Sequence, residues 1–273
     1  TTVKLRIEVM NSVDKALSEM QDFSDKLTDY TMELKDRAGD KMLDYLSELR
    51  SFPIDILKAL DIFYIGDATE MLIPSYLGMV EDFGVISPTN KKPIFHNRFV
   101  IPIKDTDGKV VNLVGYSKEA DERYVYGTAK YYRRRDTLYG LEDIGLAYDY
   151  GYAIVTEGIT DTIRIRSLGF KNSYAMCGTH GSTSILRQLN RCKYGVIKIP
   201  DRDSAGQKAL KKWKCKRSIT LNTYIKYKDI DEMCADDKDN IELVMEYINI
   251  CIDWIKLVEH KGFKTADEVV TML

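Results

Sequence analysis

The sequence has few of the residues that build disulfide frameworks, zinc sites or membrane spans. Its five cysteines are an odd number and form no CxxC pair, so a zinc ribbon or zinc finger is not encoded. It has only three histidines, far apart in the chain, and they give no indication of a histidine metal site. No stretch approaches 18 consecutive apolar residues, and no signal peptide opens the sequence. We therefore expect a cytosolic protein with reduced thiols and no membrane contact.

The sequence also lacks an excess of charge of one sign. Lys and Arg total 40 and Asp and Glu total 42, which gives a net charge of −2. This balance argues against a protein that covers nucleic acid with general positive charge, so any nucleic-acid contact must come from local patches. The 273 residues are 44% apolar and 30% charged, as in a globular protein of one large or two modest domains.

The first half of the chain predicts a helical region followed by a mixed α/β subdomain. In residues 1–95, apolar residues recur at three- and four-residue steps to about residue 50, and prolines then mark short helices and turns. In residues 96–150, β-rich runs at 99–103 and 110–114 flank the turn residues Asp105 to Gly108, which predicts a β-hairpin.

The second half predicts alternating strands and helices. In residues 151–239 we expect strands at 153–156, 172–176, 194–199 and 218–227, with helices between them. Such alternation is typical of a mainly parallel sheet flanked by helices. Residues 240–273 are expected to form a helical C-terminal segment. The predicted fold class is therefore α/β, with an α+β N-terminal part.

Acidic residues follow three of the four predicted strands. Glu157 follows the first, Asp201 and Asp203 follow the third, and Asp229 and Asp231 follow the fourth. Because the carboxyl ends of parallel strands share one edge of a sheet, we expect these carboxylates to lie close together. Any one of them could simply cap a helix, but five at one edge repel each other and require a compensating cation. Hard oxygen ligands of this kind suit Mg²⁺ or Mn²⁺.

These acidic motifs resemble a known family. Glu157-Gly-Ile-Thr-Asp161, Asp201-Arg-Asp203-Ser-Ala-Gly206 and Asp229-Ile-Asp231 are similar to the TOPRIM domain of topoisomerases, bacterial-type primases and some nucleases. The likeness extends upstream to Asn97–Asp105, Gly108-Lys-Val-Val and Leu138-Tyr139-Gly140-Leu141, and to Cys177-Gly178-Thr179. Together these segments resemble the RNA polymerase domain of bacterial, DnaG-like primases over residues 95–235, and a nuclease has no reason to carry the segment 97–141.

The resemblance implies a role for each matching residue. Glu157 would be a metal-site carboxylate and general base, catalytic together with Asp201 and Asp203. The metal ligands would be Glu157, Asp201, Asp203, Asp229 and Asp231, with Asp161 as an auxiliary acid. Template and nucleotide would be bound by Arg98, Arg123, Arg133, Arg134, Arg135 and Lys228. Metal ions would supply the chemistry of nucleotidyl transfer, as phosphoryl chemistry generally requires.

The resemblance also implies partners and departures. The partners would be single-stranded DNA, ribonucleoside triphosphates and a replicative helicase in a primosome, in a bacterial or phage-infected cell. We expect the family's zinc-binding domain to be absent from this protein, so that a separate zinc-bearing protein would supply it. Where the family has Gly-Gly-Arg, this chain has Val114-Gly115-Tyr116, which removes one cation. We expect a phage-encoded primase or an excised catalytic core.

Three functions remain open from the sequence. The first is a primase, a DNA-dependent RNA polymerase that makes short RNA primers on single-stranded DNA. The second is a metal-dependent TOPRIM nuclease, which would use the same carboxylates to activate water. The third is a catalytically inactive replisome adaptor, although the intact acidic set argues against it.

Overall fold

The computed structural model describes residues 2–177, 181–223, 226–260 and 267–271, and it divides into two compact units. Unit 1 comprises Thr1–Lys41, Ile62–Pro102 and Gly108–Tyr132, and unit 2 comprises Met42–Asp61, Ile103–Asp107 and Arg133–Leu273. These units divide the chain at positions other than the predicted boundaries at residues 95, 150 and 239. The difference arises because unit 2 takes a segment of the N-terminal region.

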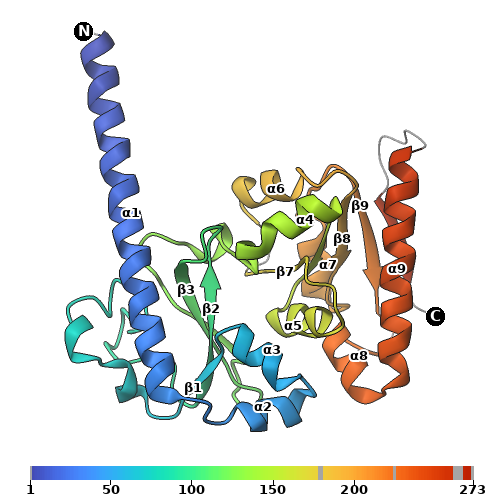
Figure 1. Cartoon of the computed structure of the whole chain (residues 1–273), viewed down its shortest axis with the longest axis horizontal. Helices are drawn as coiled ribbons and strands as arrows, with labels where there is room; N and C mark the ends of the chain where they lie inside the picture. The colour runs from blue at the N-terminus through green and yellow to red at the C-terminus, as the bar shows by residue number, and fades with distance from the viewer. Residues whose placement is uncertain (1, 178–180, 224–225, 261–266, 272–273) are drawn as a thin grey trace. The chain divides into compact units, whose positions relative to one another are not determined.

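Unit 1 combines one long helix with a four-stranded sheet (Figure 1). Its elements are α1 (Thr2–Ala38), β1 (Phe63–Ile65), β2 (Arg98–Lys104), β3 (Val110–Tyr116) and β4 (Tyr124–Tyr126), with 3₁₀ turns at Ala68–Met71 and Pro74–Tyr76. The strand order is β1-β2-β3-β4, and β1/β2 and β3/β4 pair antiparallel. The predicted hairpin is confirmed as β2 and β3, while β1 was not predicted.

The core of unit 1 lies between the sheet and the second half of α1. Phe23, Leu27, Tyr30 and Leu34 are buried there, in one cluster with residues of β1, β2 and β3. Met10 and Leu17 belong to the same apolar stripe but are 60% and 59% exposed. The stripe is therefore not a packing face at Met10 and Leu17, and it packs on the sheet only from Phe23 onward. A helix of 37 residues is about 55 Å long, more than twice the span of a seven-residue strand.

Unit 2 contains a six-stranded sheet in the order β10-β9-β8-β6-β7-β5. Its strands are β5 (Leu138–Tyr139), β6 (Tyr152–Thr156), β7 (Ser173–Met176), β8 (Gly195–Ile199), β9 (Ser218–Asn222) and β10 (Asp267–Thr271). All neighbouring pairs are parallel except β5 and β7. The predicted mainly parallel sheet is thus confirmed.

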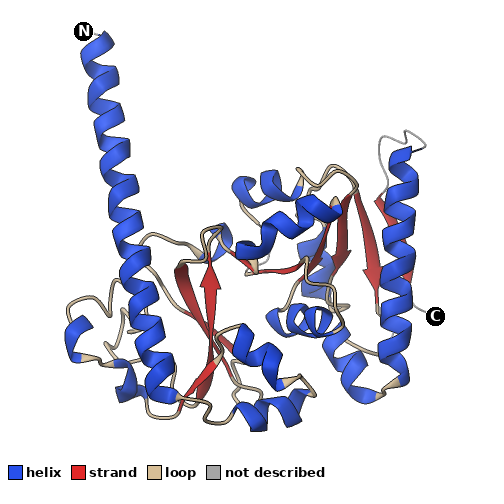
Figure 2. Cartoon of the chain, viewed as in Figure 1, coloured by secondary structure: helices blue, strands red, loops and turns tan. Residues whose placement is uncertain are grey.

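Helices cover both faces of this sheet (Figure 2). The helices of unit 2 are α2 (Leu43–Arg50), α3 (Ile54–Ala59), α4 (Ile144–Tyr150), α5 (Ile159–Ser167), α6 (Thr183–Leu189), α7 (Ser204–Leu210), α8 (Ile230–Asp236) and α9 (Asp239–His260), with 3₁₀ turns at Arg134–Asp136 and Leu141–Asp143. Residues of α5, α8 and α9 pack with Ile197 and Ile219 on one face. Residues of α4 and α6 pack with Val196 and Trp213 on the other.

The C-terminal segment differs from its prediction. The expected helix is present as α9, but Asp267–Thr271 forms the edge strand β10 instead of continuing the helix. This stretch contains Val269, Val270 and Thr271, whose β-branched side chains favour strands. The predicted strand at 218–227 ends earlier, at Asn222, and Asp229 instead precedes the short helix α8.

Candidate active site

Two adjacent parallel strands bring Glu157 and Asp201 together. Thr156, the last residue of β6, pairs with Ile199, the last residue of β8. Glu157 and Asp201 are the first and second residues beyond this pair, so they leave the sheet at the same edge. The Thr156 hydroxyl donates to the carbonyl of Gly158 at 2.8 Å and fixes the turn that carries Glu157.

Gly206 allows the two loops to approach closely. A Cβ added at Gly206 would lie 2.3 Å from the carbonyl oxygen of Asp201 and 2.8 Å from Glu157 Oε2. Any larger residue would therefore have to displace backbone. The Asp203 side chain accepts the Gly206 N–H at 2.8 Å and so begins α7. In the motif from Asp201 to Gly206, close packing therefore requires the glycine, and Asp203 caps the helix that follows.

The crowded carboxylates shift each other's protonation. Burial, together with repulsion by Asp201 and Asp203, raises the pKa of Glu157 to about 7. A backbone hydrogen bond with Asp201 and the charge of Lys228 act in the opposite direction. Burial also raises the pKa of Asp201, although Lys228 opposes this. Glu157 Oε2 is buried without a hydrogen-bond partner. A cation bound beside these carboxylates would reduce their repulsion and give Glu157 Oε2 a partner.

Lys228 supplies part of that charge. Its Nζ lies 3.1 Å from Asp201 Oδ2 and 3.4 Å from Asp203 Oδ2. Burial lowers the pKa of Lys228, but attraction by the two aspartates outweighs burial and leaves the pKa raised. A backbone hydrogen bond from Arg202 N–H to the Lys228 carbonyl holds the two loops together. Lys228 was predicted to bind nucleotide or nucleic acid, and here it contacts the acids themselves.

Two further acids, Asp161 at the start of α5 and Asp229 at the start of α8, belong to the acidic group. Asp161, in the first turn of α5, is buried, and burial with repulsion by Asp229, Asp201 and Asp231 raises its pKa far above the ordinary value. Its carboxylate accepts the backbone N–H of Asp231 at 3.0 Å. Asp229 caps α8 by accepting the Glu232 N–H at 2.8 Å.

Asp231 lies in a different environment from the other predicted ligands. Its carboxylate faces two guanidinium groups: Oδ1 accepts from Arg164 Nε at 3.0 Å, and Oδ2 accepts from Arg50 Nη1 at 2.6 Å. Arg164 also donates to the carbonyls of Ser51 and Arg50, and it lies 4.7 Å from the ring centre of Phe52. This geometry does not favour the predicted role of Asp231 as a metal ligand, because both oxygens are engaged.

Sequence reasoning missed Arg50 and Arg164. Arg164 lies three residues after Asp161 in a helix whose residues are almost all buried. A buried arginine needs a carboxylate partner, and this is the one signal that could have found it. Arg50 is 181 positions from Asp231 in the sequence, and no local pattern connects them.

The predicted basic residues are divided between the units. In unit 1, Arg98 donates to the carbonyl of Arg123 at 3.2 Å. In unit 2, Arg133, Arg134 and Arg135 are exposed, and Arg134 donates to the carbonyl of Cys177. The predicted turn at Gly178 and Thr179 lies outside the described residues.

The acidic group fits a divalent cation in its donor chemistry. In the part of the chain that the structure describes, no three His, Cys, Asp or Glu side chains form a preassembled metal-binding group. However, the oxygen donors of Glu157, Asp201 and Asp203 are hard ligands, and the buried Oε2 of Glu157 lacks a partner. Burial raises the pKa of Glu157, and repulsion by Asp201 and Asp203 adds to this rise, which a bound cation would offset. The residues therefore match Mg²⁺ or Mn²⁺ better than softer metals.

Two further observations concern the cysteines and the helices. The five cysteines are free thiols, four of them buried. Among the described residues, no helix is both long and apolar enough to cross a membrane.

Comparisons with known proteins find a Toprim-like family model and DNA primases. A Toprim-like family model matches residues 154–234. The DNA primase of Aquifex aeolicus is 32% identical over 149 residues, covering 51% of this chain and 29% of that protein. The DNA primase of Borreliella burgdorferi is 28% identical over 241 residues, covering 85% of this chain and 43% of that protein. The chain thus spans less than half the length of these relatives.

Solved structures show the same fold. The zinc-binding and RNA polymerase domains of the Aquifex aeolicus primase superpose with a TM-score of 0.68 at 22% identity, over 83% of this chain and 61% of that one. The catalytic core of the Escherichia coli primase superposes with a TM-score of 0.65 at 19% identity, over 84% and 79%. The chain therefore has the fold of the DnaG primase catalytic core, with a Toprim-like segment.

Proposed function

We propose that this chain, which resembles the RNA polymerase domain of DnaG-like primases in sequence and fold, is the catalytic part of a DNA primase. It would join ribonucleoside triphosphates into short RNA primers on a single-stranded DNA template. Such an enzyme would act during DNA replication in a bacterial or phage-infected cell.

The observation that supports this proposal is the group of acids at the ends of β6 and β8. Glu157, Asp201 and Asp203 lie together there, and only Lys228 offsets their charge among the contacts described above. Mutual repulsion of this kind destabilises a site unless a cation enters it. The arrangement therefore favours a role that includes divalent metal over a purely structural one.

The chemistry would be divided between metal and protein. Bound Mg²⁺ or Mn²⁺ would neutralise the triphosphate and activate the 3′-hydroxyl. Glu157 would be the general base, and its Oε2, which has no hydrogen-bond partner in the metal-free protein, would take up the hydroxyl proton. Asp201, Asp203 and Asp229 would provide further ligand oxygens, and Asp161 would remain an auxiliary acid.

We assign Asp231 to positioning. Its backbone N–H donates to Asp161, and its carboxylate is bound by Arg50 and Arg164. These contacts hold the start of α8, and with it Asp229, against α5. The arginines would thus act on the site only through Asp231.

The proposal also includes contacts with the template and with partner proteins. The exposed arginines 133–135 would bind the phosphates of single-stranded DNA, with Arg98 and Arg123 as further contacts. A replicative helicase and a separate zinc-binding protein would be partners, as the resemblance implies.

Primer synthesis tests the proposal directly. Wild-type protein is incubated with single-stranded DNA, Mg²⁺ or Mn²⁺ and ribonucleotides, one of them labelled, with and without helicase and zinc-domain protein. We expect short labelled RNA from the wild type and none from Asp201→Asn. The matched control is Asp253→Asn, which removes an exposed carboxylate on α9 and should leave the yield unchanged.

The other outcomes distinguish the alternatives. Loss of the DNA template without labelled RNA would identify a nuclease. Neither product nor template loss under any condition would leave an inactive adaptor. Equal primer yields from the wild type and Asp201→Asn would refute the assigned site.

A further inference from the structure

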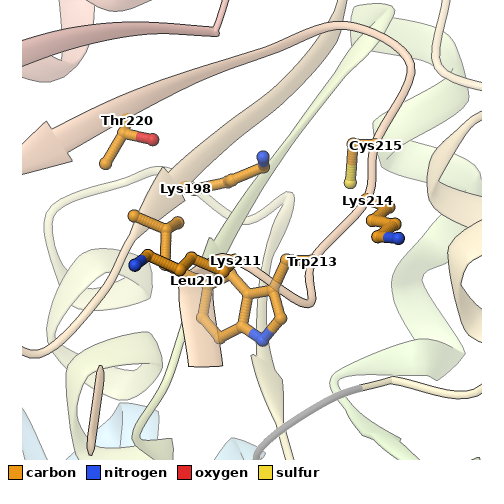
Figure 3. A pocket seen from close by; sticks show the side chains of 7 residues that line it. All are labelled: Lys198, Leu210, Lys211, Trp213, Lys214, Cys215 and Thr220. Carbon is orange, nitrogen blue, oxygen red and sulfur yellow. The ribbon is translucent and has the colours of Figure 1, made fainter. Parts of the chain in front are cut away.

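A cavity lies in unit 2, formed between the sheet and the segment after α7. Its volume is about 250 Å³, and its walls are Lys198, Leu210, Lys211, Trp213, Lys214, Cys215 and Thr220 (Figure 3). None of these residues belongs to the acidic group described above. Two lining residues, Lys211 and Lys214, belong to the lysine-rich stretch between Lys208 and Arg217. The proposed primase function gives this stretch no role.

The floor of the cavity is made by two neighbouring strands. Lys198 on β8 pairs in register with Thr220 on β9, so both side chains leave the same face of the sheet. Lys198 is 5% exposed and Thr220 is 6% exposed, so the floor places an ammonium group and a hydroxyl in a largely buried position. In Figure 3 the end of the Lys198 side chain lies between Thr220 and Cys215.

The rim adds positive charge. Lys211 and Lys214 are exposed, and their long side chains are flexible enough to turn toward a group held above Lys198. Three of the seven wall residues are therefore lysines, and this described set includes no carboxylate. Partly enclosed positive charges interact more strongly with an anion than charges on an open surface do.

We propose that this cavity binds a phosphate group. Lys198 would contact it from below, Thr220 would donate its hydroxyl, and Lys211 and Lys214 would close over it. The volume holds a phosphate together with several waters, each of which occupies about 30 Å³ in the liquid. The phosphate would belong either to a free nucleotide or to the backbone of a nucleic acid.

The chain contains its own optical probe for this site. It has two tryptophans, Trp213 in the cavity wall and Trp254 on α9. Replacing the partly exposed Trp254 by Phe leaves Trp213 as the only tryptophan. The fluorescence of this W254F protein is then titrated with inorganic phosphate, ATP or a short oligothymidylate, in EDTA so that metal-dependent binding does not contribute.

Two double variants with equal charge changes provide the test. Lys211→Gln with Lys214→Gln changes the cavity rim. Lys212→Gln with Lys216→Gln removes two exposed lysines of the same segment that do not line the cavity. We expect a saturable change in Trp213 fluorescence whose affinity falls at least tenfold in the rim variant and stays within about twofold in the control. Loss of charged hydrogen bonds is sufficient for a tenfold change.

The ligands identify the source of the phosphate. Saturation with phosphate or ATP and the expected variant pattern would assign a free phosphate compound. Saturation with oligothymidylate alone and the same pattern would assign a nucleic-acid backbone. The proposal is overturned if no probe gives a saturable change, or if both double variants weaken binding equally. Primer synthesis is not measured, so failure here leaves the primase proposal untouched.

Discussion

Replacing Arg164 by Met should strongly destabilise unit 2. Arg164 is 2% exposed and its partner Asp231 is 1% exposed, so water cannot replace the contacts that are lost. Methionine keeps the length of the aliphatic stem but removes the donors to Asp231, to the Ser51 carbonyl and to the Arg50 carbonyl. Asp231 would retain only Arg50.

The size of the effect follows from these contacts. Removing one partner of a buried ion pair costs about 3–5 kcal/mol. Each carbonyl left without a donor in the interior adds up to about 1–3 kcal/mol, and the remaining contact with Arg50 offsets part of the total. We expect the free energy of unfolding to fall by about 3–5 kcal/mol. For a typical urea dependence this lowers the midpoint by roughly 1–3 M.

Urea unfolding followed by circular dichroism measures this change. Arg187→Met is the matched control, since Arg187 is exposed on α6, and it should change stability by less than about 0.5 kcal/mol. The double variant with Asp231→Asn should lose less than the sum of the two single variants, because the residues interact directly. Equal midpoints for Arg164→Met and Arg187→Met, or strict additivity in the double variant, would refute the proposed contact.

Three further predictions concern the acidic site and the arginine run. The folded-state pKa of Glu157, about 7, lies above its ordinary value of 4.5, so the folded metal-free protein binds this proton more tightly and gains stability as pH falls through 7. Urea midpoints in EDTA at several pH values should show this gain in the wild type and a smaller one in Glu157→Gln. Gly206→Ala should reduce stability by about 1–3 kcal/mol, since the added methyl meets the Asp201 carbonyl; Gly145→Ala, which meets nothing within 4 Å, is the control, and equal unfolding midpoints would contradict the packing argument. Replacing all three arginines at 133–135 by Ala should weaken single-stranded DNA binding and flatten its salt dependence, measured by fluorescence anisotropy. An unchanged salt slope would mean that this run does not contact phosphates.

The parts of the fold that could be predicted are those with a local cause. The alternation of short apolar strands with helices predicted the sheet of unit 2, and parallel neighbouring strands bring Glu157 and Asp201 to one edge. The hairpin of β2 and β3 followed from its turn residues. The helical break near Gly39 also has a local cause, because this glycine has a φ of +58°.

The parts that could not be predicted depend on contacts distant in the sequence. Asp231 reads as a ligand in its motif, and only the folded chain brings Arg50 and Arg164 against it. The apolar stripe of α1 has the same spacing throughout, but its burial stops where the sheet stops. The edge strand β10 has β-branched residues, but with only five residues its place in the sheet depends on its pairing with β9.

The segment from Arg50 to Phe52 has a consequence for any attempt to produce the Toprim-like part alone. It precedes that part by about a hundred residues, and yet its two carbonyls and one aromatic ring surround the guanidinium of Arg164. A recombinant fragment that starts at residue 133 would expose this guanidinium and remove one of the two cations on Asp231. Restoring these contacts would require that the missing piece be supplied as a separate peptide or joined to the fragment through a new linker.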